Sequence, residues 1–264
     1  MKQYGLLGFP LMHSFSCSYF TEKFRIEDID ATYQNFSTPN LDFFFRLIEE
    51  NPLLSGLNVT IPYKQAVIPY LDSLDSEAEA IGAVNVIKIN RDNNGKPHLT
   101  GYNSDLIGFR ESIRPFIENL RNRIKGKNGD APNANKALKA LILGTGGVSK
   151  AIEYGLEQLG VETMQVSRTP APGLFTYNQL NEDIYKDYAI IVNATPLGTM
   201  PEIDICPPIH YESITQDHVL FDVVYNPEKT LFLKKGEQRG ATIKNGLEML
   251  QLQAEAAWKI WNNL

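Results

Sequence analysis

One segment constrains the fold of this chain more than any other: the apolar run Leu138–Leu143, followed directly by Gly144-Thr145-Gly146-Gly147. The residues after the glycines repeat apolar side chains at helical spacing, at positions 148, 151, 152, 156 and 159. Between a strand and a helix, Gly144 permits a tight turn and Gly146 lets a pyrophosphate approach the positive helix N-terminus. Ser149 replaces the third glycine of the usual fingerprint and is still small enough for close packing of helix on strand. The segment predicts a dinucleotide-binding turn, and the alternative is a tight turn that binds nothing.

Short strand-like runs alternate with helical runs along most of the chain, which is the pattern of a parallel α/β protein. We predict strands at 3–7, 32–36, 57–61, 138–143, 161–167, 189–193 and 219–224, a hairpin of 84–89 with 98–102, and helices at 16–26, 41–50, 63–71, 106–120 and 246–261. At one domain per roughly 150 residues, a chain of 264 residues allows two modest domains. We therefore predict an α/β fold with two domains: residues 1–104 completed by the C-terminal helix 246–264, and a Rossmann-like domain of residues 105–245.

Residues 125–136 separate the two series of predicted elements. The segment is rich in Gly, Asn and Lys and shows no apolar periodicity, so we predict a loop at the domain junction. Nothing in its composition indicates a function.

Charge and composition argue against several classes of function. The chain carries 25 Lys and Arg against 31 Asp and Glu, a formal charge of −6, and no basic block, which argues against binding to nucleic acid or to an anionic membrane. No apolar run approaches the roughly 18 residues that span a bilayer, and the N-terminus has no signal-peptide pattern. Cys17 and Cys206 stand far apart, and the four histidines show no metal-ligand spacing. We expect a cytoplasmic protein without a metal site.

The end of the predicted strand 161–167 bears on which nucleotide binds. An enzyme that uses NAD usually carries Asp or Glu there, to accept hydrogen bonds from the ribose 2′-hydroxyl. This chain has Ser167-Arg168-Thr169 and no acid. Arg168 can pair with a 2′-phosphate while Ser167 or Thr169 donates hydrogen bonds, so the position favours NADP. A solvent-exposed arginine without a ligand is the alternative.

Four short polar segments, at 8–16, 58–64, 82–85 and 101–105, lie where predicted strands give way to loops in the N-terminal part. In open α/β sheets, ligands bind beyond the carboxyl ends of the strands, so we expect these segments to converge. Ser14 and Ser16 can donate hydrogen bonds to a carboxylate, and Lys64 with Asp105 can form an ion pair that moves a proton at a carbinol or ketone. Structural roles are the alternatives: Ser16 or Asp105 as a helix cap, and Lys64 as a surface charge.

These segments, in this order, resemble the shikimate dehydrogenase family. The similarity runs through nearly the whole chain: His13-Ser14-Phe15-Ser16, 58–64, 82–85, 103–105, the glycine loop, Asn193-Ala194-Thr195, 222–225 and 246–253. The resemblance implies an α/β substrate domain and a Rossmann-like NADP-binding domain, with the active site in the cleft between them. It also implies the reversible NADPH-dependent reduction of 3-dehydroshikimate to shikimate, in chorismate and aromatic amino-acid biosynthesis.

The resemblance assigns roles to individual residues. Lys64 matches the family's catalytic lysine, and Asp105 matches its carboxylate partner. The positions that would bind the substrate are Ser14, Ser16, Thr60, Asn85, Asp105, Tyr225 and Gln253. The positions that would bind the cofactor are Gly144, Thr145, Gly146, Gly147, Val148, Ser167, Arg168, Thr169, Thr195, Val223 and Gly246. The implied partners are a small-molecule substrate and NADP, in a monomer or homodimer.

One departure from the family pattern concerns the cofactor. The family commonly has Asn-Arg-Thr followed by a second arginine around the 2′-phosphate, whereas Ser167 replaces the Asn here and Pro170-Ala171-Pro172 follows. NADP is still the expected cofactor, with one arginine fewer to hold it.

Three alternative functions are open. A quinate/shikimate dehydrogenase that uses NAD is disfavoured by the missing strand-end acid and by Ser16, whose hydroxyl suits the carboxylate of shikimate without needing room for quinate's additional hydroxyl. A catalytically silent, shikimate-binding regulatory protein should have lost Lys64 or Asp105, and both are present. A methylenetetrahydrofolate dehydrogenase has the same domain plan but no need for the paired Ser14 and Ser16.

Overall fold

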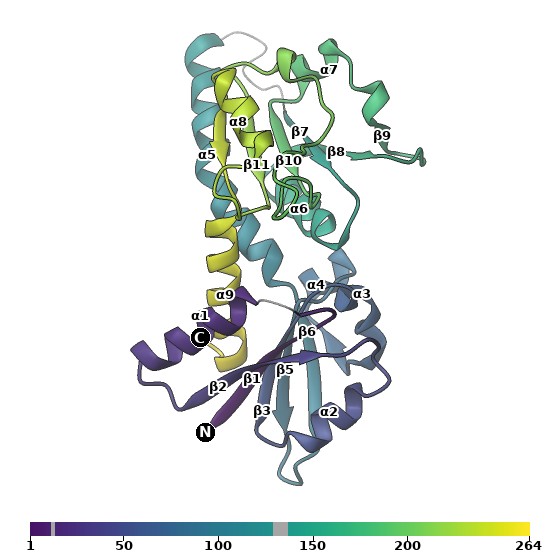
Figure 1. Ribbon diagram of the computed structural model, residues 1–264, viewed down its shortest axis with the longest axis vertical. Helices are drawn as coiled ribbons and strands as arrows, with labels where there is room; N and C mark the ends of the chain where they lie inside the picture. Colours follow the sequence, from purple (N-terminus) through teal and green to yellow (C-terminus); the bar gives the residue numbers. More distant parts are fainter. Residues whose placement is uncertain (12–13, 129–136) are drawn as a thin grey trace. The chain divides into compact units, whose positions relative to one another are not determined.

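The computed structural model describes residues 1–11, 14–128 and 137–264, which divide into two compact units. Unit 1 is Met1–Ser104 with Ala254–Leu264, and unit 2 is Asp105–Gln253. Each unit is built on one six-stranded sheet with helices packed against it (Figure 1). His13 and the part 129–136 of the predicted loop lie outside the described residues.

The sheet of unit 1 has the order β2-β1-β3-β5-β6-β4. β1 pairs in parallel with β2 and β3, whereas β5 runs antiparallel to both β3 and β6. The predicted hairpin is therefore present, but it makes this sheet mixed rather than parallel. The strands are β1 (Lys2–Gly8), β2 (Ala31–Ser37), β3 (Leu54–Val59), β4 (Ser73–Leu74), β5 (Val86–Arg91) and β6 (Pro97–Tyr102).

The helices of unit 1 are α1 (Phe15–Ile26), α2 (Phe44–Glu50), α3 (Tyr63–Ala66) and α4 (Ser76–Ile81). Ser14, and not Ser16, caps α1, because its hydroxyl oxygen accepts a hydrogen bond from the Cys17 N–H at 3.1 Å. The predicted helix 63–71 divides into α3 and the 3₁₀ turn η1 (Ile68–Tyr70), since Pro69 has no N–H to continue the helical ladder.

The end of α9 (Leu247–Asn262) completes unit 1. Trp261 is 4% exposed, and its Nε1–H donates to the carbonyl of Ile87 at 3.1 Å. A Cβ on Gly56 would collide with the indole, so β3 needs glycine at this point of close approach. The last residues of the chain are thus part of the core of unit 1.

The division between the units falls inside α9, at Gln253/Ala254, rather than before the helix as predicted. Met249, in the first half of α9, belongs to an apolar core that is otherwise formed by unit 2. A Cβ on Gly108 of α5 would collide with the carbonyl of Met249, so the two helix backbones touch there. Close packing of α9 on α5 therefore assigns its first half to unit 2.

The sheet of unit 2 has the order β12-β11-β10-β7-β8-β9, and all its strand pairs are parallel. Numbered from β7, the strands stand in the order 3-2-1-4-5-6 when read from β9, which is the order of doubly wound dinucleotide-binding folds. The winding direction reverses between β7 and β10. The strands are β7 (Leu138–Leu143), β8 (Val161–Ser167), β9 (Phe175–Thr176), β10 (Ile190–Asn193), β11 (Val219–Asp222) and β12 (Thr242–Lys244).

The helices of unit 2 are α5 (Ser104–Asn128), α6 (Gly147–Gln158), α7 (Glu182–Asp187), α8 (Leu231–Gln238) and the first half of α9, with the 3₁₀ turns η3 (Tyr177–Gln179) and η4 (Tyr211–Ser213). Helix α5 is longer than the predicted 106–120, and residues 125–128 of the predicted loop belong to it. Ile124 extends its apolar stripe, because that side chain still packs against the core of unit 2.

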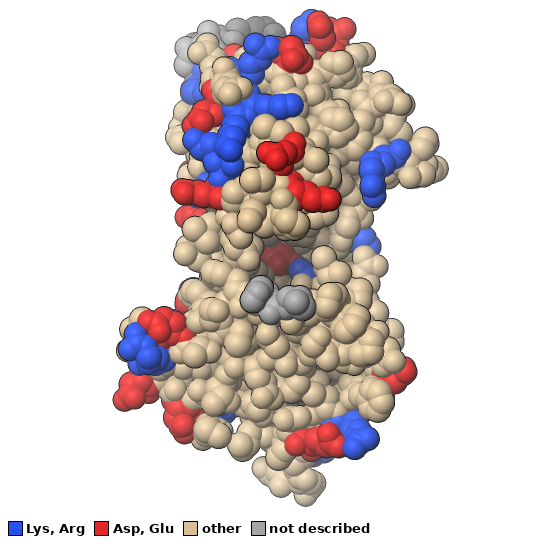
Figure 2. All heavy atoms as spheres, in the orientation of Figure 1, with Lys and Arg blue, Asp and Glu red and all other residues tan. Residues whose placement is uncertain are grey.

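Charges of both signs lie beside one another on the face drawn in Figure 2. Near α8, Lys229 pairs with Glu237 at 2.9 Å. Within the described residues, no helix is long and apolar enough to cross a membrane. In the same part of the chain, no three His, Cys, Asp or Glu side chains are grouped closely enough to hold a metal ion.

Candidate active site

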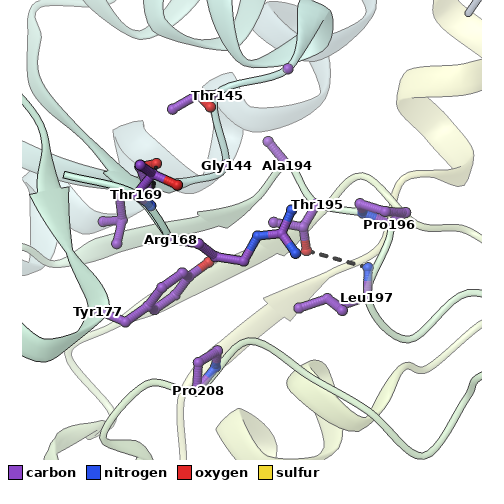
Figure 3. Close-up of a pocket in the computed structure, with 13 residues that line it drawn as sticks. Gly144, Thr145, Arg168, Thr169, Tyr177, Ala194, Thr195, Pro196, Leu197 and Pro208 are labelled. Carbon is purple, nitrogen blue, oxygen red and sulfur yellow. Dashed lines mark hydrogen bonds between the residues drawn. The ribbon is translucent and has the colours of Figure 1, made fainter. Parts of the chain in front are cut away.

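A cavity of about 420 Å³ opens in unit 2 where the carboxyl ends of β7, β8 and β10 lie side by side (Figure 3). This is the point at which the strand order reverses, where open α/β sheets bind their ligands. The lining residues come from the loops that follow these strands, from η3 and from the segment before η4: Gly144, Thr145, Gly146, Val166, Ser167, Arg168, Thr169, Tyr177, Ala194, Thr195, Pro196, Leu197 and Pro208.

The glycine loop shapes one side of this cavity. Gly144 has φ +111°, a region that favours glycine, and a Cβ there would stand 3.1 Å from Cγ2 of Thr195. Gly146 caps α6, and a Cβ on it would meet nothing within 4 Å, so the helix N-terminus faces open space. Ser149 is fully buried and donates from Oγ to the carbonyl of Gly146 at 2.6 Å. The predicted dinucleotide turn therefore has room for a phosphate group at the positive end of a helix.

A buried hydrogen-bond network shapes the neighbouring part of the cavity wall, where the chain leaves β10 beside β7. Asn193, fully buried at the end of β10, accepts at Oδ1 from both the N–H (3.1 Å) and the hydroxyl (2.6 Å) of Thr195. Its Nδ2 donates to Oδ1 of Asp222 at 3.0 Å. Burial raises the pKa of the Asp222 carboxyl to about 7, although hydrogen bonds from Thr230, Val224 and Asn193 oppose the shift. The network fixes the loop that carries Thr195 into the cavity.

Arg168 is the one charged side chain among the described residues that line the cavity. It follows β8 and is exposed, and no described acidic group forms an ion pair with it. Ser167 Oγ accepts a hydrogen bond from the N–H of Thr169 at 3.1 Å, which leaves its O–H available as a donor. The cavity therefore offers a guanidinium and hydroxyl donors, and no described carboxylate lines it.

Four other predicted cofactor positions, Gly147, Val148, Val223 and Gly246, are not among the described residues that line the cavity. Gly147 is the first residue of α6, and Val148 packs against the core of unit 2. Val223 and Gly246 touch each other, since a Cβ on Gly246 would collide with the Val223 carbonyl. Gly246 also donates its N–H to the carbonyl of Val224 at 3.2 Å.

Backbone hydrogen bonds in unit 1 hold together three predicted site residues: Thr60 and Asn85, predicted to bind substrate, and the predicted catalytic residue Lys64. The N–H of Thr60 donates to the carbonyl of Leu7 at 2.9 Å, and the N–H of Phe9 donates to the carbonyl of Ile61 at 3.0 Å, so the loops after β1 and β3 meet. The carbonyl of Lys64 accepts from Val84 at 2.7 Å, one residue before Asn85. These bonds bring Thr60, half-buried Lys64 and buried Asn85 to one end of the sheet.

The side chain of Asn85 ties this group to the start of α5. Asn85 is 2% exposed, and its Oδ1 accepts from the N–H of Ser104 at 2.6 Å while Nδ2 donates to Ser104 Oγ at 3.1 Å. Asn85 thus holds in place the residue that precedes Asp105. The Asn85 amide therefore has a structural partner, Ser104, in addition to its expected role in binding the substrate.

Ser16 belongs to a second buried network in unit 1, which the sequence did not indicate. Its side chain hydrogen-bonds the hydroxyl of Tyr33, and that hydroxyl donates to Oδ1 of Asn58 at 2.8 Å. Burial raises the pKa of Tyr33 well above its usual range, and the bond from Ser16 opposes that rise. Asn58 donates in turn to the carbonyl of Asn85 at 3.4 Å. Tyr33 therefore connects Ser16 to the group that contains Lys64 and Asn85.

Replacing Tyr33 with phenylalanine should destabilise the protein by about 1–3 kcal/mol, because the buried Oδ1 of Asn58 loses its donor. The matched control is Tyr4→Phe, at the residue paired with Tyr33 in the sheet, whose hydroxyl makes only a partly exposed 3.4 Å bond to Asn262. The control should cost less than about 1 kcal/mol. Urea unfolding measures both, and equal losses would contradict the role of the Ser16–Tyr33–Asn58 network.

The remaining predicted substrate residues lie in unit 2. Asp105 is 4% exposed in the first turn of α5, and Gln253 lies on α9. One turn after Asp105, Gly108 permits close contact with α9, where an added Cβ would stand 3.1 Å from the Cβ of Gln253. Tyr225 follows β11 and is 39% exposed. Asp105 and Gln253 therefore lie on packed neighbouring helices.

Comparisons with known proteins identify the family to which the chain belongs. A family model described as the shikimate dehydrogenase substrate binding domain matches residues 6–87. The NADP⁺ shikimate dehydrogenase of Desulforamulus reducens is 34% identical, over 97% of this chain and 88% of its own. The crystal structure of shikimate dehydrogenase from Aquifex aeolicus aligns with a TM-score of 0.81 at 32% identity, covering 100% of this chain and 93% of that one. Quinate dehydrogenase from Corynebacterium glutamicum, solved in complex with NAD, aligns with a TM-score of 0.81 at 25% identity, covering 100% and 94%. As its ordered motifs predict, the chain belongs to the shikimate dehydrogenase family.

Proposed function

We propose that this protein catalyses the reversible, NADPH-dependent reduction of 3-dehydroshikimate to shikimate. The observation that carries the proposal is the cavity at the strand-order reversal, whose one described charged lining residue is the cation Arg168. An unpaired arginine at this place can hold a 2′-phosphate, whereas the ribose of NAD usually meets an acid there. In a chain of this family, the cavity indicates NADP.

The residues present fit the cofactor. The N-terminus of α6 faces open space at Gly146 and suits the pyrophosphate, and Arg168 with Ser167 and Thr169 would hold the 2′-phosphate. Thr145 and Thr195 also line the cavity. NADPH, when bound, supplies the hydride for the ring ketone.

The remaining chemistry belongs to the side chains of the protein. The Lys64 ammonium donates a proton to the carbonyl oxygen as it becomes a hydroxyl, and it stabilises the negative charge that develops there. Asp105 orients that ammonium and accepts a hydrogen bond from the neighbouring ring hydroxyl. Ser14 and Ser16 hold the substrate carboxylate, while Thr60, Asn85, Tyr225 and Gln253 contact the other polar groups of the ring.

The assay that tests the function measures reduction of NADP or NAD with shikimate and, separately, with quinate. We expect the largest kcat/KM for shikimate with NADP. A larger value for quinate with NAD would replace the proposal with the quinate dehydrogenase alternative. Binding of shikimate without any turnover would favour the silent regulatory protein instead.

Replacing Arg168 with alanine should lower kcat/KM for NADP by about ten- to a hundredfold, because a charge-assisted bond contributes roughly 1.5–3 kcal/mol. The value for NAD should change little, since NAD has no 2′-phosphate. Steady-state kinetics with both cofactors measure the difference. Equal losses for both cofactors would show that Arg168 supports the structure of the loop instead.

We also propose that the enzyme is cytoplasmic and acts as a monomer or homodimer. A small-molecule substrate and a diffusible cofactor are consistent with both statements. Sedimentation of the purified protein tests the oligomeric state.

A further inference from the structure

Among the described residues that line the cavity, one polar side chain has no role assigned by the resemblance, that of Tyr177. This residue lines the cavity together with Arg168, and Figure 3 shows its hydroxyl end turned toward the Arg168 side chain. Within the described parts of the chain, the hydroxyl makes no hydrogen bond. A half-buried donor without a partner, on the wall of a ligand cavity, is positioned for a ligand atom.

Sheet pairing explains why Tyr177 and Arg168 are neighbours. β8 and β9 are parallel, with Ser167 opposite Thr176, so the residues that follow each strand emerge side by side. Thr176 and Gln179 close a capping box around η3, in which the Thr176 N–H donates to Gln179 Oε1 at 2.7 Å. The first residue of η3 is therefore held in place next to the arginine.

The surroundings of Tyr177 keep its hydroxyl protonated, so that it can donate a hydrogen bond. Burial raises its pKa to about 12, with the charge of Arg168 opposing the rise, so the hydroxyl is protonated at neutral pH. A protonated phenol beside a guanidinium presents two kinds of donor to one anion. Such a pair suits a phosphate monoester, whose oxygens accept several hydrogen bonds.

We propose that Tyr177 is a specificity residue for the cofactor, whose hydroxyl donates a hydrogen bond to the 2′-phosphate of NADP beside Arg168. The proposal rests on the proposed function, because it takes NADP as the ligand of this cavity. It supplies a donor at a site where the chain has one arginine fewer than the family pattern. NAD offers only a 2′-hydroxyl there, so the contact distinguishes the two cofactors.

Direct binding tests the proposal without turnover. Calorimetry on the full chain should show that Tyr177→Phe raises the Kd for NADP about tenfold, which corresponds to about 1.4 kcal/mol, and leaves the Kd for NAD unchanged. Two fragments of the cofactors should behave in the same way. Tyr177→Phe should raise the Kd for adenosine 2′,5′-bisphosphate about tenfold and leave the Kd for 5′-AMP unchanged. Tyr188→Phe is the matched control. Tyr188 packs edge-on against Phe175 in the same unit, and it is not among the described residues that line the cavity. This variant should leave both constants unchanged.

The outcomes separate this proposal from the proposed function. If the wild-type protein binds NADP no better than NAD, the cofactor assignment fails. If the wild type prefers NADP and Tyr177→Phe keeps that preference in full, only the role of Tyr177 is overturned. An equal loss for NADP and NAD would also overturn it, since it would mean that the hydroxyl acts on a part of the nucleotide common to both.

Discussion

Lys64→Ala should lower kcat for shikimate oxidation by about 10²–10⁴, the usual contribution of a positioned general acid or base. The reason is that, in this direction, the ring hydroxyl loses the group that accepts its proton, and the alkoxide that develops loses the positive charge that stabilises it. Other contacts with the ring remain, so KM for shikimate should change far less. Stopped-flow measurement of nicotinamide absorbance with saturating NADP gives both constants.

The control for this experiment is Lys96→Ala, an exposed lysine in the β5–β6 turn of the same unit, which should leave kcat unchanged. A normal turnover in Lys64→Ala, with weakened binding of shikimate, would show that Lys64 is a binding residue. In that case the proton donor has to be another group.

The free energy of unfolding should fall by up to about 4 kcal/mol as the pH rises from about 4 to about 7, through the titration of Asp222 alone. The folded-state pKa of this carboxyl is about 7 against an ordinary value of 3.8, so the folded chain binds the proton more tightly than the unfolded chain does. The stability that depends on the bound proton is fully present below the ordinary pKa of 3.8 and is lost as the pH rises through the folded-state pKa of about 7.

Comparison with Asp222→Asn isolates this contribution, because the amide does not titrate. Urea unfolding at pH 5 and pH 8 should show a smaller loss of stability in the variant than in the wild type. Asp204→Asn, at an exposed position, should follow the wild-type curve. Parallel curves for wild type and Asp222→Asn would contradict the prediction and indicate that the three hydrogen bonds to the carboxylate offset its burial.

The parts of the fold that sequence predicts well are those whose signal is local. Leu138–Leu143 and the glycines after it predict both β7 and the turn, because a short buried strand and a positive φ each depend on the residues themselves. The position of Arg168 is predictable for the same reason, because this residue directly follows a strand that can be recognised from its own sequence. The end of α5 is less predictable. Ile124 packs against the core of unit 2 and so stabilises the last turns of the helix, and the local sequence does not reveal this contact.

The residues that sequence reasoning missed depend on contacts between distant segments. Tyr33 reaches Asn58 and Ser16 only because β1 lies between β2 and β3. Tyr177 lies beside Arg168 through the pairing of a two-residue strand, which is too short to show any alternation. Neither tyrosine differs in sequence context from one that simply packs in a core.

The division of α9 has a consequence for how the chain is made. Unit 1 needs Trp261 against Gly56, so its core stays incomplete until residues 254–264 have left the ribosome. Domains commonly fold in the order in which they are synthesised. Here unit 2 is contiguous in sequence, from Asp105 to Gln253, and can be completed while unit 1 still lacks its last helical turns. The second unit to be translated is therefore the first that can finish folding.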